Sequence, residues 1–254
     1  MKKMPSKSFE AASLLVLLVS APLLAAKFWE SKEFTTWSQK ECMELLNKSP
    51  WTQSLSFGST LSARTMPADA PVSIRDAPTE GKLGEQDSTV VFQFRALTAK
   101  PIRLALMRLQ MLKKPDDAAL REQAAKIDEE PAGKEIAIQV SYQTVPQGSS
   151  AVHDLHSYFL QSTWITFRDS TSLASEKSGI VPVARYLPPS EKQANPLFIF
   201  PRVNEKGEPY FTGEEKSIAL MSEFEPTINN AKQRYKIYVK LNPREMKFQN
   251  AFAF

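Results

Sequence analysis

Residues 136–143 read Ile-Ala-Ile-Gln-Val-Ser-Tyr-Gln, and this stretch decides the fold class. Larger apolar side chains alternate with small or polar ones, which is typical of a half-buried strand. The same alternation runs from Val90 to Ala96 and from Tyr235 to Leu241. Because one face of each strand is polar, the pattern predicts an antiparallel sheet rather than a parallel one. Further strands are expected at 163–168, 180–187, 197–202 and 216–224, with a hairpin turn at 204–207.

Two helices are expected between the first two of these strands. The apolar residues of 101–114 form a broad set that predicts a largely buried helix, and Pro115 ends it. A second helix opens at Asp116 and Asp117, where acidic residues suit the helix dipole. Its inward-facing residues are expected to be Leu120, Ala124 and Ile127. The predicted fold is α+β, a mostly antiparallel sheet covered by these two central helices, with a short N-terminal helix.

The short N-terminal helix is predicted to begin at Ser38. Residues 38–41 read Ser-Gln-Lys-Glu, the pattern of a capping box, and Ser49 before a proline disfavours further helix. The residues that share one helical face are Cys42, Leu45 and Leu46. Cys42 is the only cysteine, so an intramolecular disulfide is excluded and packing explains the residue.

Residues 1–26 have the three parts of a secretory signal. A basic start is followed by an apolar run that contains Leu-Leu-Val-Leu-Leu-Val, and small residues end it at Ala25 and Ala26. The run is shorter than the ~20 residues that cross a bilayer, and Pro22 interrupts it. A buried N-terminal helix is the alternative, but the run lacks a polar face. We expect cleavage after Ala26, a periplasmic or secreted protein, and no permanent membrane span afterwards.

The chain after the signal divides into three parts. Residues 27–61 form an N-terminal helix and strand segment, 62–87 a polar, proline-rich loop or linker, and 88–254 an α+β domain. A functional lid is the alternative for 62–87, since long loops within domains often carry function. Its lack of aromatic residues and of periodicity favours a plain loop.

Composition and charge exclude several classes of function. The chain contains Gly 8 and Pro 18, which disfavours glycine-rich phosphate loops and favours strands and connections. Loss of the signal removes three lysines and one glutamate and lowers the formal charge from +4 to +2. Basic and acidic residues are interspersed along the mature chain, so nucleic acid is not expected as a partner.

Two patches of sequence resemble an uncharacterised family of exported bacterial proteins in which a short helix leads into a Ser-Pro-Trp motif. The first patch contains Trp37-Ser38, Glu41-Cys42, Leu45-Leu46 and Ser49-Pro50-Trp51. The second contains Arg95-Ala96-Leu97 and the helix from Ile102 to Leu112 with Arg103 and Arg108. The resemblance covers about half of the chain. It implies export and carries no catalytic residues.

The sequence contains no strong signature of catalysis, a cofactor or a metal. His153 and His156 lie three residues apart, and on a helix two imidazoles at this spacing can share a metal ion. A stable site needs further ligands that the sequence does not supply nearby, so exposed or hydrogen-bonding histidines are the expectation. Solvated helix ends and a loop explain the adjacent acids better than acid/base pairs do. These pairs are Asp116-Asp117, Glu129-Glu130 and Glu214-Glu215.

Aromatic residues provide the remaining indication of function. In the predicted strands, Trp164 and Phe167 lie on opposite faces, as do Tyr235 and Tyr238. An exposed second face can bind a partner, whereas a second covering layer makes the same residues core, and the sequence favours core. The apolar terminus at 248–254 predicts a last strand that docks on the sheet or on another chain.

These observations favour an exported, non-enzymatic protein that has a binding or structural role in the periplasm or cell envelope. Its partner is expected to be a protein or another envelope component. The alternative is an exported hydrolase with an unrecognised site, in which carboxylates or the two histidines gather in a cleft. We assign no catalytic, cofactor-binding or metal-binding residues and no cofactor from the sequence.

Overall fold

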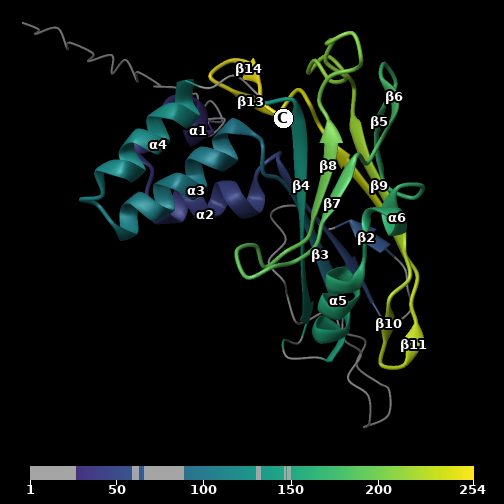
Figure 1. Ribbon diagram of the computed structural model, residues 1–254. Coiled ribbons are helices and arrows are strands. Elements are labelled where there is room, and N and C mark those ends of the chain that lie inside the picture. Colours follow the sequence, from purple (N-terminus) through teal and green to yellow (C-terminus); the bar gives the residue numbers. More distant parts are fainter. Residues whose placement is uncertain (1–26, 59–62, 66–88, 130–132, 146, 148–149) are drawn as a thin grey trace, which may run out of the picture.

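The computed structural model describes residues 27–58, 63–65, 89–129, 133–145, 147 and 150–254 (Figure 1). Its larger sheet has six antiparallel strands. In spatial order these are β2 (Ala63–Thr65), β1 (Thr52–Phe57), β3 (Thr89–Ala96), β4 (Glu135–Val145), β8 (Leu197–Pro201) and β7 (Arg185–Leu187). The predicted alternation is confirmed in β3, where every second side chain is buried.

A four-stranded antiparallel sheet packs on one face of the six-stranded sheet. Its strands lie in the order β12 (Tyr235–Leu241), β9 (Ile218–Phe224), β5 (Ser172–Ser175) and β6 (Gly179–Pro182). Aromatic rings fill the space between the sheets: the Phe92 ring lies 5.0 Å from Tyr235 and 5.6 Å from Phe224. The core is therefore a sandwich of two sheets.

One predicted strand, 180–187, is broken into β6 and β7, because the chain changes sheets within it. The Val183 amide donates to the carbonyl of Thr171, and the next amide, Ala184, donates to the carbonyl of Ile199. The first of these acceptors borders the four-stranded sheet and the second belongs to β8. Alternation along a sequence does not reveal such a corner, because both halves keep the same spacing.

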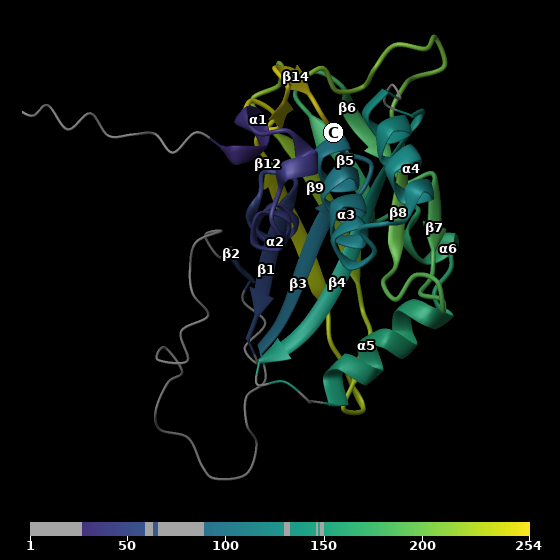
Figure 2. The ribbon, with the colours of Figure 1, turned by 90° about the vertical axis from the view of Figure 1, so that its left-hand side faces the viewer.

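Helices cover the other face of the six-stranded sheet and lie over one end of its strands (Figure 2). These are α1 (Phe28–Ser31), the 3₁₀ helix η1 (Phe34–Thr36), α2 (Gln39–Lys48), α3 (Lys100–Lys113) and α4 (Ala118–Glu129). The predicted α+β fold with two central helices, α3 and α4, is thus found. In addition, α3 packs against both α2 and α4, and α2 contacts β1, so the N-terminal helix belongs to the covering layer.

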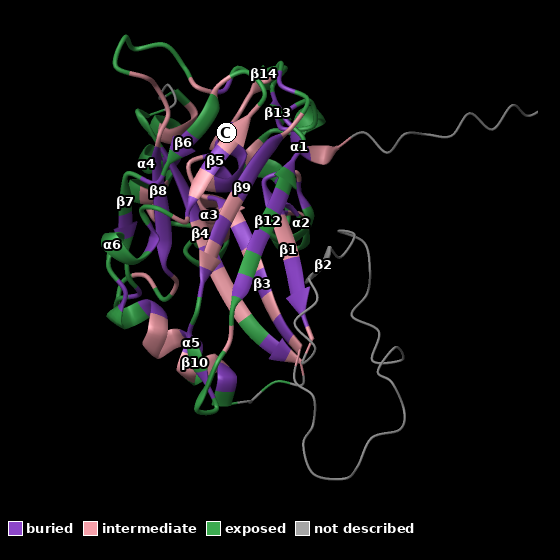
Figure 3. Cartoon of the chain, turned by 90° about the vertical axis from the view of Figure 1, so that its right-hand side faces the viewer, coloured by how far each residue is buried: buried purple, intermediate pink, exposed green. Residues whose placement is uncertain are grey.

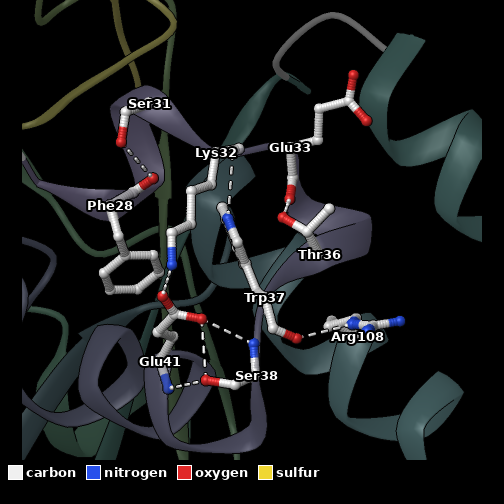
Figure 4. Close-up of polar contacts among 9 residues, drawn as sticks. All are labelled: Phe28, Ser31, Lys32, Glu33, Thr36, Trp37, Ser38, Glu41 and Arg108. Carbon is white, nitrogen blue, oxygen red and sulfur yellow. Dashed lines mark hydrogen bonds and ion pairs between the residues drawn. The ribbon is translucent and has the colours of Figure 1, made fainter.

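The predicted capping box at the start of α2 is confirmed (Figure 4). The Glu41 amide donates to Ser38 Oγ at 3.2 Å, and the Ser38 amide donates to Glu41 Oε2 at 2.8 Å. Arg108 of α3 donates from Nε to the carbonyl of Trp37 at 2.9 Å, which ties α3 to this cap. Cys42 is fully buried, and burial raises its thiol pKa to about 11, which keeps the thiol protonated.

The strand predicted at 163–168 is wrong, because Trp164–Phe167 form the one-turn helix α6 directly after α5 (Ser150–Gln161). The Thr163 amide donates to Thr166 Oγ1, which caps the turn. Phe167 is buried, with its ring 4.7 Å from Tyr186. A short apolar run does not distinguish strand from helix by its spacing alone.

The C-terminal residues form a hairpin rather than the predicted single strand. β13 (Lys247–Phe248) pairs with β14 (Ala251–Phe252), and the two turn residues Gln249 and Asn250 both have positive φ. Phe248 packs on Trp37 at 6.3 Å between ring centroids, so the terminus docks on the N-terminal segment of its own chain. Asn229 and Asn230 form a similar turn between β10 (Thr227–Ile228) and β11 (Ala231–Lys232).

The remaining predictions fall on several regions. The turn at 204–207 is confirmed by a hydrogen bond from the Gly207 amide to the Asn204 carbonyl at 3.0 Å. β2 lies at the start of the loop predicted at 62–87, whereas residues 66–88 and the predicted signal lie outside the described residues. In the ranges that the structure describes, no helix is both long and apolar enough to cross a membrane.

Candidate functional site

The two histidines lie on α5 but do not form the centre of a titratable cluster. His153 is exposed, whereas Nδ1 of His156 lies 3.0 Å from the hydroxyl of Tyr142. Burial raises the pKa of Tyr142 to about 12, so this hydroxyl stays protonated at neutral pH. Asp154 accepts a hydrogen bond from the Asn229 amide. Among the described residues, no group of three or more His, Cys, Asp or Glu side chains gathers to hold a metal ion.

The paired acids have separate structural partners. Glu214 forms an ion pair with Lys177 at 2.8 Å, whereas Glu215 is buried and accepts from the amides of Thr212 and Gly213, both at 2.9 Å. Burial acts to raise the pKa of Glu215, but these backbone hydrogen bonds hold it below its usual value. Asp117 accepts from the first amides of α4. Glu215 and Asp117 therefore support local backbone, whereas Glu214 pairs with a lysine side chain; Glu130 lies outside the described residues.

A cavity of about 470 Å³ lies between η1, α3 and α4. Its apolar lining includes Phe34 and Met111. Two of its charged residues are bound elsewhere, since Asp128 pairs with Lys100 at 2.9 Å and Arg121 donates to the carbonyl of Pro115. These contacts give Asp128 and Arg121 structural roles, and Glu129 is a further carboxylate in the lining.

The outer face of the four-stranded sheet has exposed apolar side chains at both of its edges, and we call it the open face. Strand register places Tyr238, Met221, Ser172 and Pro182 in one row across the four strands. The adjacent row contains Lys240, Ala219, Ala174 and Ile180. Figure 3 shows this face toward the viewer, with no described element in front of it.

The most exposed apolar side chains of the open face lie at its two edges. Tyr238 on edge strand β12 is 53% exposed and Ile180 on the opposite edge strand β6 is 71% exposed. The central strands β9 and β5 contribute small residues to this face, Ala219, Ser172 and Ala174, together with Met221. The Lys240 ammonium lies 5.7 Å from the Tyr238 ring centroid, within the range of a cation–π contact.

In each of the two aromatic pairs singled out in the sequence, one ring is buried and the other is exposed. Tyr235 is buried between the sheets while Tyr238, three residues later, is exposed on the open face. The expectation of a second covering layer is therefore wrong for Tyr238. Trp164 is also exposed, on α6, and its Nε1 donates to the carbonyl of Val183 at 3.0 Å.

Sequence reasoning missed Ile180, Met221 and the small residues between them as parts of one surface. The signal was present in the strands, because these residues occupy alternate positions to the buried ones. These residues form one surface only because the strand order β12-β9-β5-β6 brings together segments far apart in the chain.

Comparisons with known proteins give no relative: no model of a known protein family, no curated protein and no solved structure matches this chain. The resemblance to a family of exported proteins thus stays a prediction, and the functional argument depends on the open face.

Proposed function

We propose that the protein is exported and acts in the periplasm or cell envelope as a non-enzymatic binding protein, with the open face as its binding surface. This proposal rests on the position of exposed Tyr238, half-buried Met221 and exposed Ile180 in two adjacent rows of a sheet whose inner face belongs to the aromatic core. Contiguous apolar surface of this kind marks interaction sites in soluble proteins. Glu214, Glu215 and Asp117 are each engaged in an ion pair or in backbone hydrogen bonds, which favours binding over catalysis.

Protection from thiol labelling tests this proposal. Cys42 is the only cysteine and is buried, so single cysteines can be introduced at Tyr238 or Met221 with little background. Lys192→Cys is the matched control, because Lys192 is exposed in the loop between β7 and β8. We expect maleimide to label all three positions in purified protein, but to label 238 and 221 more slowly than 192 in intact envelopes. Equal labelling of the three positions in envelopes contradicts a bound partner on the open face.

Export is tested separately by the mass and N-terminus of the native protein. The proposal expects a chain that starts at Lys27 in the periplasmic or envelope fraction. Recovery of the native chain from the cytosol with Met1 or its initiator-processed equivalent contradicts export. This measurement does not depend on whether the partner has been identified.

A further inference from the structure

Positive charge concentrates along one edge of the open face. The segment 231–247, which contains β12, has six basic residues and one acidic residue, Glu245. All six basic residues are exposed: Lys232, Arg234, Lys236, Lys240, Arg244 and Lys247. Lys236 and Lys240 share the open face with Tyr238, since all three occupy alternate positions of β12. Lys232 precedes the strand, and Arg244 and Lys247 follow it, so the charge extends past both ends.

Acidic neighbours cancel only part of this charge. Glu223, opposite Lys236 in the strand register, is paired with Arg234, and Arg234 also lies 3.5 Å from Glu225. In the part of the chain that the structure describes, neither Lys236 nor Lys240 has an ion-pair partner. Lysines elsewhere near this sheet are neutralised, as Lys177 is by Glu214. The β12 edge thus keeps a local excess of positive charge although the whole mature chain has almost none.

We propose that the open face docks on an anionic lipid surface. In this arrangement the lysines of β12 lie against the headgroups, and Tyr238, Met221 and Ile180 contact the boundary between headgroups and acyl chains. The inference rests on the proposed function, because it names the partner of the same face. Lysines near an anionic bilayer are attracted without any specific geometry, and a tyrosine suits a boundary with one apolar and one wet side.

The chemistry of the face favours lipid over an acidic protein. The two unpaired cations beside Tyr238 are lysines, which are depleted from protein–protein interfaces, whereas arginine is enriched there. The cavity described above lies among helices on the far side of the six-stranded sheet, away from the open face. A surface with a charged edge needs no pocket to bind a bilayer.

Lysines on an edge strand also have a simpler use, because they discourage pairing with a second copy of the sheet. Charge reversal separates the two uses. A glutamate at the same position still discourages edge pairing, but it repels an anionic surface. The double variant Lys236→Glu/Lys240→Glu is therefore expected to remain monomeric and folded while losing its affinity for the bilayer.

The test is sedimentation of the purified protein with vesicles of equal parts phosphatidylglycerol and phosphatidylcholine, compared with vesicles of phosphatidylcholine alone. We expect binding only to the anionic vesicles, weakened by added salt. Lys236→Glu/Lys240→Glu should reduce this binding by about tenfold or more. The control Lys192→Glu/Lys206→Glu makes the same change in net charge at exposed residues outside this face and should alter binding by less than about twofold.

Each outcome decides the inference. Absence of binding to the anionic vesicles overturns it, as does an equal loss in the control variant. If the reversed variant does not fold, Lys236→Gln and Lys240→Gln are measured singly, and unchanged binding in both overturns it. Failure with vesicles together with protection of position 238 in envelopes indicates a protein partner, so the proposed function stands and the lipid inference falls. If the protein does not bind the anionic vesicles and position 238 is not protected in envelopes, both the lipid inference and the proposed binding function are contradicted.

Discussion

The outer faces of the two sheets contrast in composition and in cover. The outer face of the six-stranded sheet is largely polar on β1, β3 and β4, yet helix α2 covers one end of it. The open face of the four-stranded sheet is more apolar across its strands, yet no described element covers it. The covered face also has a small buried apolar cluster of Ala137, Leu197 and Ile199 on β4 and β8. On the open face, Tyr238 and Ile180 stay exposed, and we explain their exposure by a use outside the folded chain.

Arg95 shows how the polar face accepts a covering helix. Its Nε donates to the carbonyl of Leu46 in α2 at 2.7 Å, and its two terminal nitrogens donate to Gln139 at 3.1 Å and Gln93 at 2.7 Å. A further bond reaches the side chain of Asn47 in α2. Burial lowers the pKa of Arg95, but the guanidinium remains charged at neutral pH. One side chain thus joins the helix to two strands.

The largest effect is expected on the face that the two sheets share. Tyr235 lies on the inner side of β12, with its ring 5.1 Å from Phe57 and 5.6 Å from Phe224. Tyr235→Ala should lower the free energy of unfolding by about 3–5 kcal/mol, because it leaves a cavity among packed rings. Chemical denaturation measures this loss. A loss below about 1 kcal/mol is inconsistent with a shared aromatic core.

Removal of the Arg95 side chain, which joins α2 to β3 and β4, should have the next largest effect on stability. Arg95→Ala removes the donor from two glutamine oxygens and one of two donors from the Leu46 carbonyl, which keeps its bond from Thr52 Oγ1, and should lower the free energy of unfolding by about 2–3 kcal/mol. Arg95→Lys keeps the charge but not the forked geometry, and should recover only part of this loss. Full recovery by lysine indicates that charge, rather than the hydrogen bonds to α2 and the strands, is what matters.

Loosening the covering helix at its start should have a smaller effect. Ser38→Ala removes the acceptor for the Glu41 amide and should lower the free energy of unfolding by about 1 kcal/mol. Ser38→Asp restores an acceptor at the cap and serves as the matched control. Thermal unfolding of the two variants checks the expectation, which fails if both melt at the same temperature.

The same cap should make stability depend on acid pH. The side chain of Lys32, followed by the Ser38 amide, lowers the pKa of Glu41 from 4.5 to about 2. Since the folded pKa lies below the unfolded one, the carboxylate contributes fully above pH 4.5, and the contribution falls as the pH is lowered toward about 2. Wild type should exceed Glu41→Gln in stability at neutral pH, and the difference should shrink over this window. A difference independent of pH contradicts the assignment.

The smallest effect on stability is expected on the open face. Tyr238→Ser should change the free energy of unfolding by less than about 0.5 kcal/mol, because the ring is exposed and packs mainly against Lys240. Denaturation beside Tyr235→Ala, from the same strand, measures the contrast between its two faces. A large loss for Tyr238→Ser indicates that the open face has a structural role.

Local signals in the sequence predicted much of the fold. The capping box placed the start of α2, and alternation placed β3, β4, β9 and β12, because both patterns are set by residues close together in the chain. The wrong predictions fall where the spacing of apolar residues fits both helix and strand, or does not reveal a change of sheet. The short run at Trp164 formed a helix, and the strand at 180–187 was interrupted by a change of sheet.

The candidate surface was only half predictable. Alternation placed Tyr235 and Tyr238 on opposite faces of one strand, but it did not show which face another layer covers. Which face is covered depends on the strand order and on where α2, α3 and α4 pack, and contacts between segments far apart in the chain determine both. The excess of positive charge around β12 was also not predicted, because basic and acidic residues nearly cancel over the whole chain.

Photo-crosslinking from the two outer faces tests the central claim most directly. A benzophenone amino acid is placed at Tyr238 on the open face, or at Gln143, which is exposed on the outer face of β4, and the protein is irradiated in intact envelopes. The account predicts an adduct with protein or lipid from position 238 and little from position 143. No adduct from 238, or equal adducts from both positions, contradicts the open face as the working surface.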